Sequence, residues 1–112
     1  MTQHDDSIIL RQILEHAEEA LRIIEGKTYT DIEHDRILNL ALVRLLEIIG
    51  EAAGRISKST RGKFPQIPWI TIVAMRNRLI HGYDQIDLNI VWDVIENDLP
   101  PLINELRRVL SS

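Results

Sequence analysis

The apolar residues of this chain recur at the three- and four-residue spacing of an α-helix along almost its whole length. No stretch shows the sustained apolar–polar alternation that is typical of a half-buried β-strand. The pattern therefore predicts an all-α protein. A chain of 112 residues, 45% of them hydrophobic and 27% charged, can build one hydrophobic core, and we expect a single domain over residues 1–112.

The ends of the first two helices follow from capping residues and helix breakers. The first helix is expected to begin near residues 5–7, which offer capping oxygens, and to end at Gly26, where glycine can adopt a left-handed conformation. The second is expected to open with a capping box of Thr30 and Glu33. This helix is predicted to be long, reaching about Ser57.

The second half of the chain is predicted to hold two more helices after a basic loop over residues 58–67. Pro68 suits the first turn of a third helix, which should end near His81. Asp87 can cap a fourth helix, whose apolar stripe stays in phase across Pro100-Pro101 although the prolines remove amide donors. We therefore predict a four-helix up-down bundle whose last helix is kinked or split at these prolines.

The second predicted helix carries more apolar surface than one neighbour requires. Its expected inner face is formed by Ile37, Leu40, Ala41, Leu45, Ile48, Ala52 and Ile56. A second apolar flank is formed by Val43, Leu46, Ile49 and Ala53. This flank predicts a further partner surface and, with it, oligomerisation.

Gly50 and Gly54 lie one turn apart in the same helix. Each glycine inside a helix costs about 1 kcal/mol relative to alanine. We expect another backbone to approach closely at these positions. The alternative is that tertiary packing simply tolerates the two glycines.

Charge is distributed unevenly along the chain. The net charge of −4 argues against general nucleic-acid binding, yet residues 52–83 contain six lysines and arginines and no aspartate or glutamate. The other 80 residues carry seven basic and 17 acidic side chains. Such a division could steer an anionic ligand to one place, or it could be a solvated positive loop, and charge alone leaves both open.

Composition excludes several classes of site. Without cysteine the chain has no disulfide, no thiolate metal site and no cysteine nucleophile. His4, His16 and His34 lack the spacing of metal ligands and no glycine-rich phosphate loop occurs, so we expect no metal and no bound cofactor. The acidic N-terminal residues and the absence of an apolar run of about 18 residues predict a cytoplasmic protein without membrane association.

The residues most suited to chemistry lie near the end of the third predicted helix. Arg76 falls within an apolar stripe, and because an unpaired buried guanidinium is costly, it should meet a carboxylate, carbonyl groups or solvent at a groove. Asn77 and His81 are four residues apart on a neighbouring face, and Tyr83 follows. Arginine and histidine without a metal suit RNA cleavage, because imidazole can take a proton from the 2′-hydroxyl while guanidinium stabilises charge on phosphorus.

Each of these residues also has a purely structural interpretation. His81 could interact with the dipole at a helix C-terminus. Arg76 could form an ion pair with Glu47 or Glu51 inside the bundle, and Tyr83 could be a core aromatic residue with its hydroxyl at the surface. Composition and periodicity do not decide between the two interpretations.

The segment Arg76-Asn-Arg-Leu-Ile-His81-Gly-Tyr83 matches Arg-x4-His-x-Tyr and resembles the signature of HepT-like toxins in the HEPN ribonuclease superfamily. Similar residues of that family occur at four further places, so the resemblance covers most of the chain. These places are Ile48-Ile-Gly-Glu-Ala52, Pro68-Trp69, Met75-Arg-Asn and Val91-Trp92.

The resemblance implies a HEPN-type helical bundle that forms a homodimer and cleaves RNA without a metal in a shared cleft. Arg76 would stabilise the phosphorane-like state, His81 would act as general base or acid, and Asn77 would help to orient the site. The implied partner is a minimal nucleotidyltransferase antitoxin, which forms a hetero-oligomer and transfers AMP from ATP to Tyr83. ATP and magnesium would belong to that partner.

An alternative is a non-catalytic binding or scaffold subunit of a nucleotidyltransferase complex. This alternative explains the second apolar flank and the pair Gly50 and Gly54 without any chemistry. A member of the family that has lost its activity would carry the same pattern.

Overall fold

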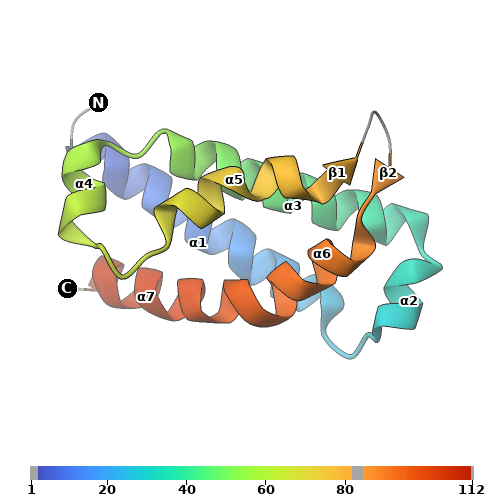
Figure 1. The fold of residues 1–112 in the computed structure, drawn as a ribbon. Helices are drawn as coiled ribbons and strands as arrows, with labels where there is room; N and C mark the ends of the chain where they lie inside the picture. The colour runs from blue at the N-terminus through green and yellow to red at the C-terminus, as the bar shows by residue number, and fades with distance from the viewer. Residues whose placement is uncertain (1–2, 82–84, 112) are drawn as a thin grey trace.

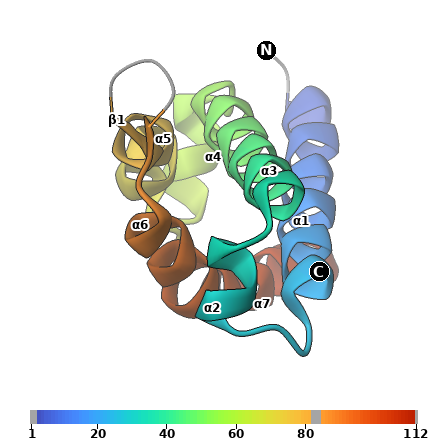
Figure 2. The same cartoon turned by 90° about the vertical axis from the view of Figure 1, so that its right-hand side faces the viewer.

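The computed structural model describes residues 3–81 and 85–111 and is an all-α bundle, as expected. Its long helices run side by side with alternating direction: α1 (Gln3–Ile24), α3 (Arg36–Gly54), α5 (Trp69–Leu79) and a C-terminal helical stretch (Figure 1). Figure 2, which views the bundle from one end, shows these elements around a common centre. None of the described helices combines the length and the hydropathy of a membrane-spanning segment.

The hydrophobic core takes side chains from every long helix. Fully buried members include Ile13 and Ala17 of α1, Leu42, Leu46 and Ile49 of α3, Met75 and Leu79 of α5, and Val91, Ile95, Leu99 and Leu106 of the C-terminal stretch. Continuous burial along all four elements explains why the helical period is visible over the whole sequence.

The predicted second helix is interrupted near its beginning. The capping box is formed by Thr28 and Asp31, whose side chains accept from each other's backbone N–H at 3.2 and 2.9 Å, and not by Thr30 and Glu33. It opens the short helix α2 (Tyr29–Glu33), after which Asp35 caps α3 by accepting from Leu38 N–H at 3.0 Å. Two competing caps within eight residues therefore divide one predicted helix into two. Gly26 ends the preceding turn with a φ of 77°, as expected.

The segment predicted as a basic loop contains the helix α4 (Lys58–Lys63). Ser57 caps it by accepting from Thr60 N–H at 3.2 Å. The hydroxyl groups of Ser57 and Thr60 both donate to Oδ2 of Asp6 at 2.6 Å, so this carboxylate is buried within α1 and does not cap it. Burial raises the pKa of Asp6, but these hydrogen bonds outweigh that effect and leave the pKa below its ordinary value.

The buried face of α3 is not the one that we expected. Ile37 and Leu40, assigned to the inner face, are 82% and 46% exposed. The residues that face the core are Leu38, Leu42, Val43, Leu46, Ile49, Gly50 and Ala53, which include all of the supposed second flank. Both sides of the helix are apolar, so the period alone cannot show which side packs against α1 and α5.

The C-terminal helical stretch is divided as expected just before the two prolines. It consists of α6 (Leu88–Asp93), the π-helical segment η1 (Val94–Asp98) and α7 (Leu99–Ser111). In η1 the N–H of Leu99 bonds the carbonyl of Val94 five residues earlier, which lets the chain enter Pro100-Pro101 without breaking the helical direction. Asp87 caps α6 by accepting from the N–H of Ile90 at 3.3 Å, also as expected.

Candidate functional site

The site is organised by the contact between α3 and α5 at Gly50. A Cβ atom at this position would lie 3.2 Å from the carbonyl oxygen of Ile72 and 3.8 Å from Cβ of Arg76. The close backbone approach predicted for Gly50 is therefore confirmed, and it places Arg76 directly against α3. The same prediction is wrong for Gly54, which is exposed at the last residue of α3 and whose Cβ position has no described atom of another element within 4 Å.

Arg76 meets a carboxylate at the surface between the two helices. Its Nη1 lies 3.9 Å from Oε1 of Glu51, and Nη1 of Arg44 lies 3.8 Å from the same oxygen. The side chain of Arg76 is 59% exposed, so Glu51 does not bury it inside the bundle. Two guanidinium groups around one carboxylate leave a local positive charge, and guanidinium groups suit bidentate binding of phosphate oxygens.

Arg44 belongs to this cluster but is not among the candidates predicted from the sequence, and Glu51 is predicted only as a possible partner of Arg76 inside the bundle. The two residues are seven positions apart on α3, which places them on one face of the helix two turns apart. This signal was present in the sequence. The apolar period does not reveal its meaning, because both sides of α3 are apolar and only tertiary packing decides which face borders α5.

The backbone of His81 does not continue α5. The helix ends at Leu79, and β1 (Ile80–His81) pairs with β2 (Gln85–Ile86) in a short antiparallel hairpin in which His81 lies opposite Gln85. The expectations that the helix reaches His81, and that Asn77 and His81 share a helical face, are therefore wrong.

The return of the chain after α5 explains the early end of the helix. The N–H of Asp87 bonds the carbonyl of Leu79 at 2.9 Å, so a residue beyond the hairpin satisfies the end of α5. Asn77 is exposed on the last turn of α5, one residue after Arg76. The side chain of His81 and all of Tyr83 lie outside the described residues, so their positions relative to Arg76 stay predictions from the motif.

Arg78 belongs to the opposite side of α5. Its Nη1 lies 3.9 Å from Oδ2 of Asp98 in η1, whereas Arg76 turns toward α3. Burial of Asp98 and the nearby charge of Asp93 raise the pKa of Asp98, although Arg78 opposes this effect. Arg78 therefore does not join the Arg44, Glu51 and Arg76 cluster.

The acid-free segment 52–83 is divided in space. Arg76 lies on the second half of α5, toward the hairpin, whereas Arg55, Lys58, Arg61 and Lys63 lie at or beside α4 at the other end of the bundle (Figure 1). The positive charge of this segment thus does not converge on the motif.

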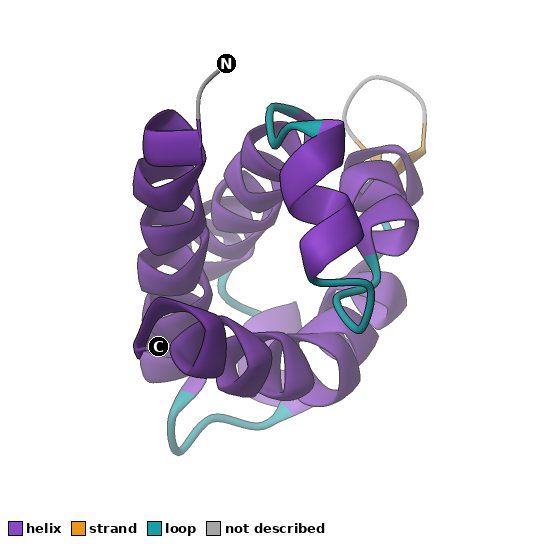
Figure 3. Ribbon diagram, turned by 90° about the vertical axis from the view of Figure 1, so that its left-hand side faces the viewer, coloured by secondary structure: helices purple, strands orange, loops and turns teal. Residues whose placement is uncertain are grey.

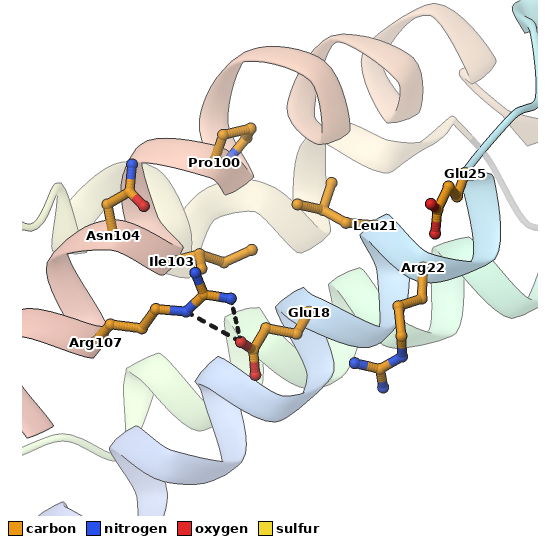
Figure 4. Close-up of a pocket in the computed structure, with 8 residues that line it drawn as sticks. All are labelled: Glu18, Leu21, Arg22, Glu25, Pro100, Ile103, Asn104 and Arg107. Atoms are coloured by element: carbon orange, nitrogen blue, oxygen red, sulfur yellow. Dashed lines mark hydrogen bonds and ion pairs between the residues drawn. The ribbon is translucent and has the colours of Figure 1, made fainter.

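Two cavities of the described structure lie away from this cluster. A groove of about 400 Å³ runs between α1 and α7, where Nε of Arg107 donates to Glu18 at 3.1 Å (Figure 4). A smaller cavity of about 270 Å³ lies between α5 and η1 and is bordered by Thr71, Met75 and Asp98. Neither is lined by Arg76, so among the described residues the cluster of Arg44, Glu51 and Arg76 lies on an exposed surface away from both cavities.

The sequence matches the model of one protein family. The family is described as "Ribonuclease HepT-like", and the match extends over residues 13–109.

Several known protein sequences are similar over almost the full chain. "Putative RNase MJ1380" of Methanocaldococcus jannaschii is 35% identical over 109 residues, which are 97% of this chain and 100% of that protein. "Putative RNase TTE0752" of Caldanaerobacter subterraneus subsp. tengcongensis is 36% identical over 101 residues, or 90% of each chain. "Probable ribonuclease HepT" of Thermococcus cleftensis is 33% identical over 103 residues, 88% of this chain and 94% of that one. No solved structure gives a significant match.

Proposed function

The chain belongs to the HepT-like ribonuclease family, and we propose from this that it is the RNA-cleaving toxin of a toxin–antitoxin pair. The observation that carries the proposal in this chain is the cluster of Arg44, Glu51 and Arg76. It presents guanidinium groups at the surface, beside the helix end from which the motif continues. We propose that the protein acts in the cytoplasm, without membrane association.

The proposed reaction uses no metal and no bound cofactor. His81 takes the proton of the RNA 2′-hydroxyl, whose oxygen attacks phosphorus while the 5′-oxygen leaves. A second protonated group, such as His81 of another copy, gives a proton to the leaving oxygen. Arg76 stabilises the negative charge that grows on the phosphate oxygens, and the amide of Asn77 helps to orient the strand.

We propose that two copies of the chain form a homodimer through the exposed sides of α3 and α5. Ile37 and Ile70 are 82% and 85% exposed, and Leu40 and Val73 are 46% and 37% exposed. Large aliphatic side chains at such exposure favour a protein interface. Because these residues share α3 and α5 with the arginine cluster, the dimer would bring two sites near each other.

We further propose that a minimal nucleotidyltransferase antitoxin silences the protein by transferring AMP from ATP, with magnesium, to Tyr83. The proposal for Tyr83 rests on the motif, since this residue lies outside the described part of the chain. AMP adds bulk and negative charge two residues from His81, and such a charge would repel RNA phosphates.

The ribonuclease proposal is tested with protein purified without its partner and assayed on RNA in EDTA. The parent should cleave, whereas Arg76→Ala and His81→Ala should lose at least about 100-fold in rate, the usual contribution of an acid–base or charge-stabilising group. Arg11→Ala, which removes an exposed cation from α1, is the matched control and should cleave normally. Equal rates for all four proteins would reject the catalytic assignment. In cells, expression of the parent without its partner should arrest growth, and unchanged growth would favour the scaffold alternative.

The modification is tested by intact mass after co-expression with the nucleotidyltransferase. The mass should rise by whole AMP units in the parent and stay unchanged in Tyr83→Phe. An unmodified parent, or an equally modified variant, would reject Tyr83 as the acceptor.

A further inference from the structure

A group of cations gathers at the end of the bundle opposite the hairpin. Figures 1 and 3 show α4 lying across this end. Lys58 and Lys63 are the first and last residues of α4, and Arg55 directly follows α3. All three side chains are exposed. We call these three residues the α4 patch.

The charges of the α4 patch are not neutralised by the described residues. None of the three cations forms an ion pair there, whereas Arg76 and Arg78 do. The neighbouring acids are already engaged: Asp6 is buried beneath α4 and accepts from Ser57 and Thr60. A fourth cation, Arg61, is half-buried and donates to the carbonyl of Ala53 at 3.0 Å, so it serves to end α3.

Glu105 of α7 is engaged as well, because it accepts from Arg108 at 2.7 Å. By contrast, Arg11, Arg22 and Lys27 in the first part of the chain lie among glutamates and aspartates of the same segment. An anion approaching the α4 patch therefore meets local positive charge in a chain whose net charge is −4.

Helix α5 connects the α4 patch to the end that carries the motif. Its 11 residues span about 16 Å at 1.5 Å per residue. A strand stacked as in a duplex advances about 3.4 Å per phosphate and an extended single strand advances further, so about five nucleotides or fewer cover this length. An RNA strand held at Arg76 can thus reach the α4 patch with nucleotides that flank the cleaved bond.

We propose that Arg55, Lys58 and Lys63 form a second binding site for the phosphate backbone of single-stranded RNA. The proposal rests on the ribonuclease function proposed above, and it adds a place where the substrate is held away from the reacting phosphate. Lysine and arginine contacts to phosphate position a strand without reading its bases. The site therefore favours long substrates over short ones, whatever their sequence.

The test compares two triple variants that change the net charge equally. Arg55→Gln/Lys58→Gln/Lys63→Gln removes the α4 patch, and Arg11→Gln/Arg22→Gln/Lys27→Gln removes three exposed cations elsewhere. Both are prepared with His81→Ala to prevent cleavage, and anisotropy of labelled oligouridylate measures Kd in EDTA at several salt concentrations. The six lysine and arginine side chains that are replaced are exposed, and circular dichroism checks that each variant folds.

The expected result depends on the length of the probe. For an oligomer of about 20 nucleotides, loss of three phosphate contacts should weaken binding at least about 10-fold and lower the slope of log Kd against log salt by about 2. An oligomer of about four nucleotides is too short to profit from both sites at once, so the same substitutions should weaken its binding less than that of the long probe. The control variant should keep the parental slope with both probes.

Three results would overturn the proposal. The first is a patch variant that binds the long probe as tightly as the control variant does, while the parent cleaves RNA. This result rejects the RNA site at the α4 patch but leaves the ribonuclease function intact. The second is a patch variant that binds RNA normally but no longer associates with the nucleotidyltransferase, which makes the patch a protein contact. The third is a parent that neither binds nor cleaves RNA, which refutes the ribonuclease function and the patch together.

Discussion

The two glycines of α3 offer a matched pair of substitutions whose effects should differ in sign. Gly54→Ala adds a methyl group to open space at the end of the helix. Alanine is favoured over glycine in helices by up to about 1 kcal/mol, so we expect this variant to be more stable by about 0.5–1 kcal/mol. Such a change raises Tm by several degrees in a domain of this size.

Gly50→Ala carries the same gain in helix propensity but adds a steric conflict. The new methyl group lies 3.2 Å from the backbone carbonyl oxygen of Ile72, which cannot turn away as a side chain can. Overpacking of this kind costs about 1–3 kcal/mol, so the net effect is a loss of up to about 2 kcal/mol. The two variants should therefore differ by about 1–3 kcal/mol, which is the cost of the conflict alone.

Urea unfolding followed by circular dichroism measures this difference, with the parent as reference. Gly50→Ala should also slow RNA cleavage under fully folded conditions, because a displaced α5 carries Arg76 away from Glu51. If Gly50→Ala stabilises the protein as much as Gly54→Ala does, the carbonyl of Ile72 does not prevent a methyl group at position 50, and the steric argument is refuted. Normal cleavage by Gly50→Ala would separately refute its role in placing Arg76.

Five further outcomes are expected. Asp6→Ala should cost about 1–3 kcal/mol in urea unfolding, since it leaves the buried hydroxyl of Thr60 and the half-buried hydroxyl of Ser57 without their acceptor. Because folding lowers the pKa of Asp6, its carboxylate stabilises the parent above about pH 4 and loses this effect as pH falls through the lowered pKa, so Asp6→Asn should flatten the acid side of the stability profile. Asp98 has a raised pKa, so its ionisation weakens the fold as pH rises, and Asp98→Asn should gain stability relative to the parent at pH 7 but not at pH 3. Glu51→Gln should lower kcat, because Arg76 loses the carboxylate that positions it, and should also lower KM for RNA, because the surface loses a negative charge. Unchanged kcat and KM would exclude Glu51 from the site. Ile70→Glu should give a monomer by sedimentation and lose cleavage, and a cleaving monomer would refute the shared site.

Local signals in the sequence were sufficient for features that depend on one segment. The left-handed Gly26, the cap Asp87 and the division before Pro100-Pro101 all follow from the chemistry of a few neighbouring residues. Features that depend on distant partners were not predicted correctly. Asp6 looks like a helix cap until Ser57, 51 positions later, is placed beside it.

The same distinction explains which residues of the candidate site can be predicted from the sequence. Arg76 was identified because an arginine beside an apolar stripe needs a partner, and Glu51 was named as one of two possibilities. Arg44 is hidden because the face of α3 that borders α5 is set by tertiary packing. The hydrogen bond from the N–H of Asp87 to the carbonyl of Leu79 ends α5 before His81, and it joins a residue within the motif segment to one beyond it. Periodicity identifies an apolar face, but only tertiary packing shows which neighbour covers it.

The position of Glu51 limits how the surface can bind RNA. The carboxylate of Glu51 lies about 4 Å from the guanidinium groups of Arg44 and Arg76. A phosphate that approaches Arg76 must therefore compete with this carboxylate for the two arginines. Exposed ion pairs are each worth only about 0–1 kcal/mol, which a phosphate with several contacts can exceed but a free ion at low concentration cannot. A substrate anchored elsewhere overcomes this competition more easily, because the second contact is then intramolecular. The α4 patch supplies such an anchor, and this links a weakly binding reaction site to a preference for long RNA.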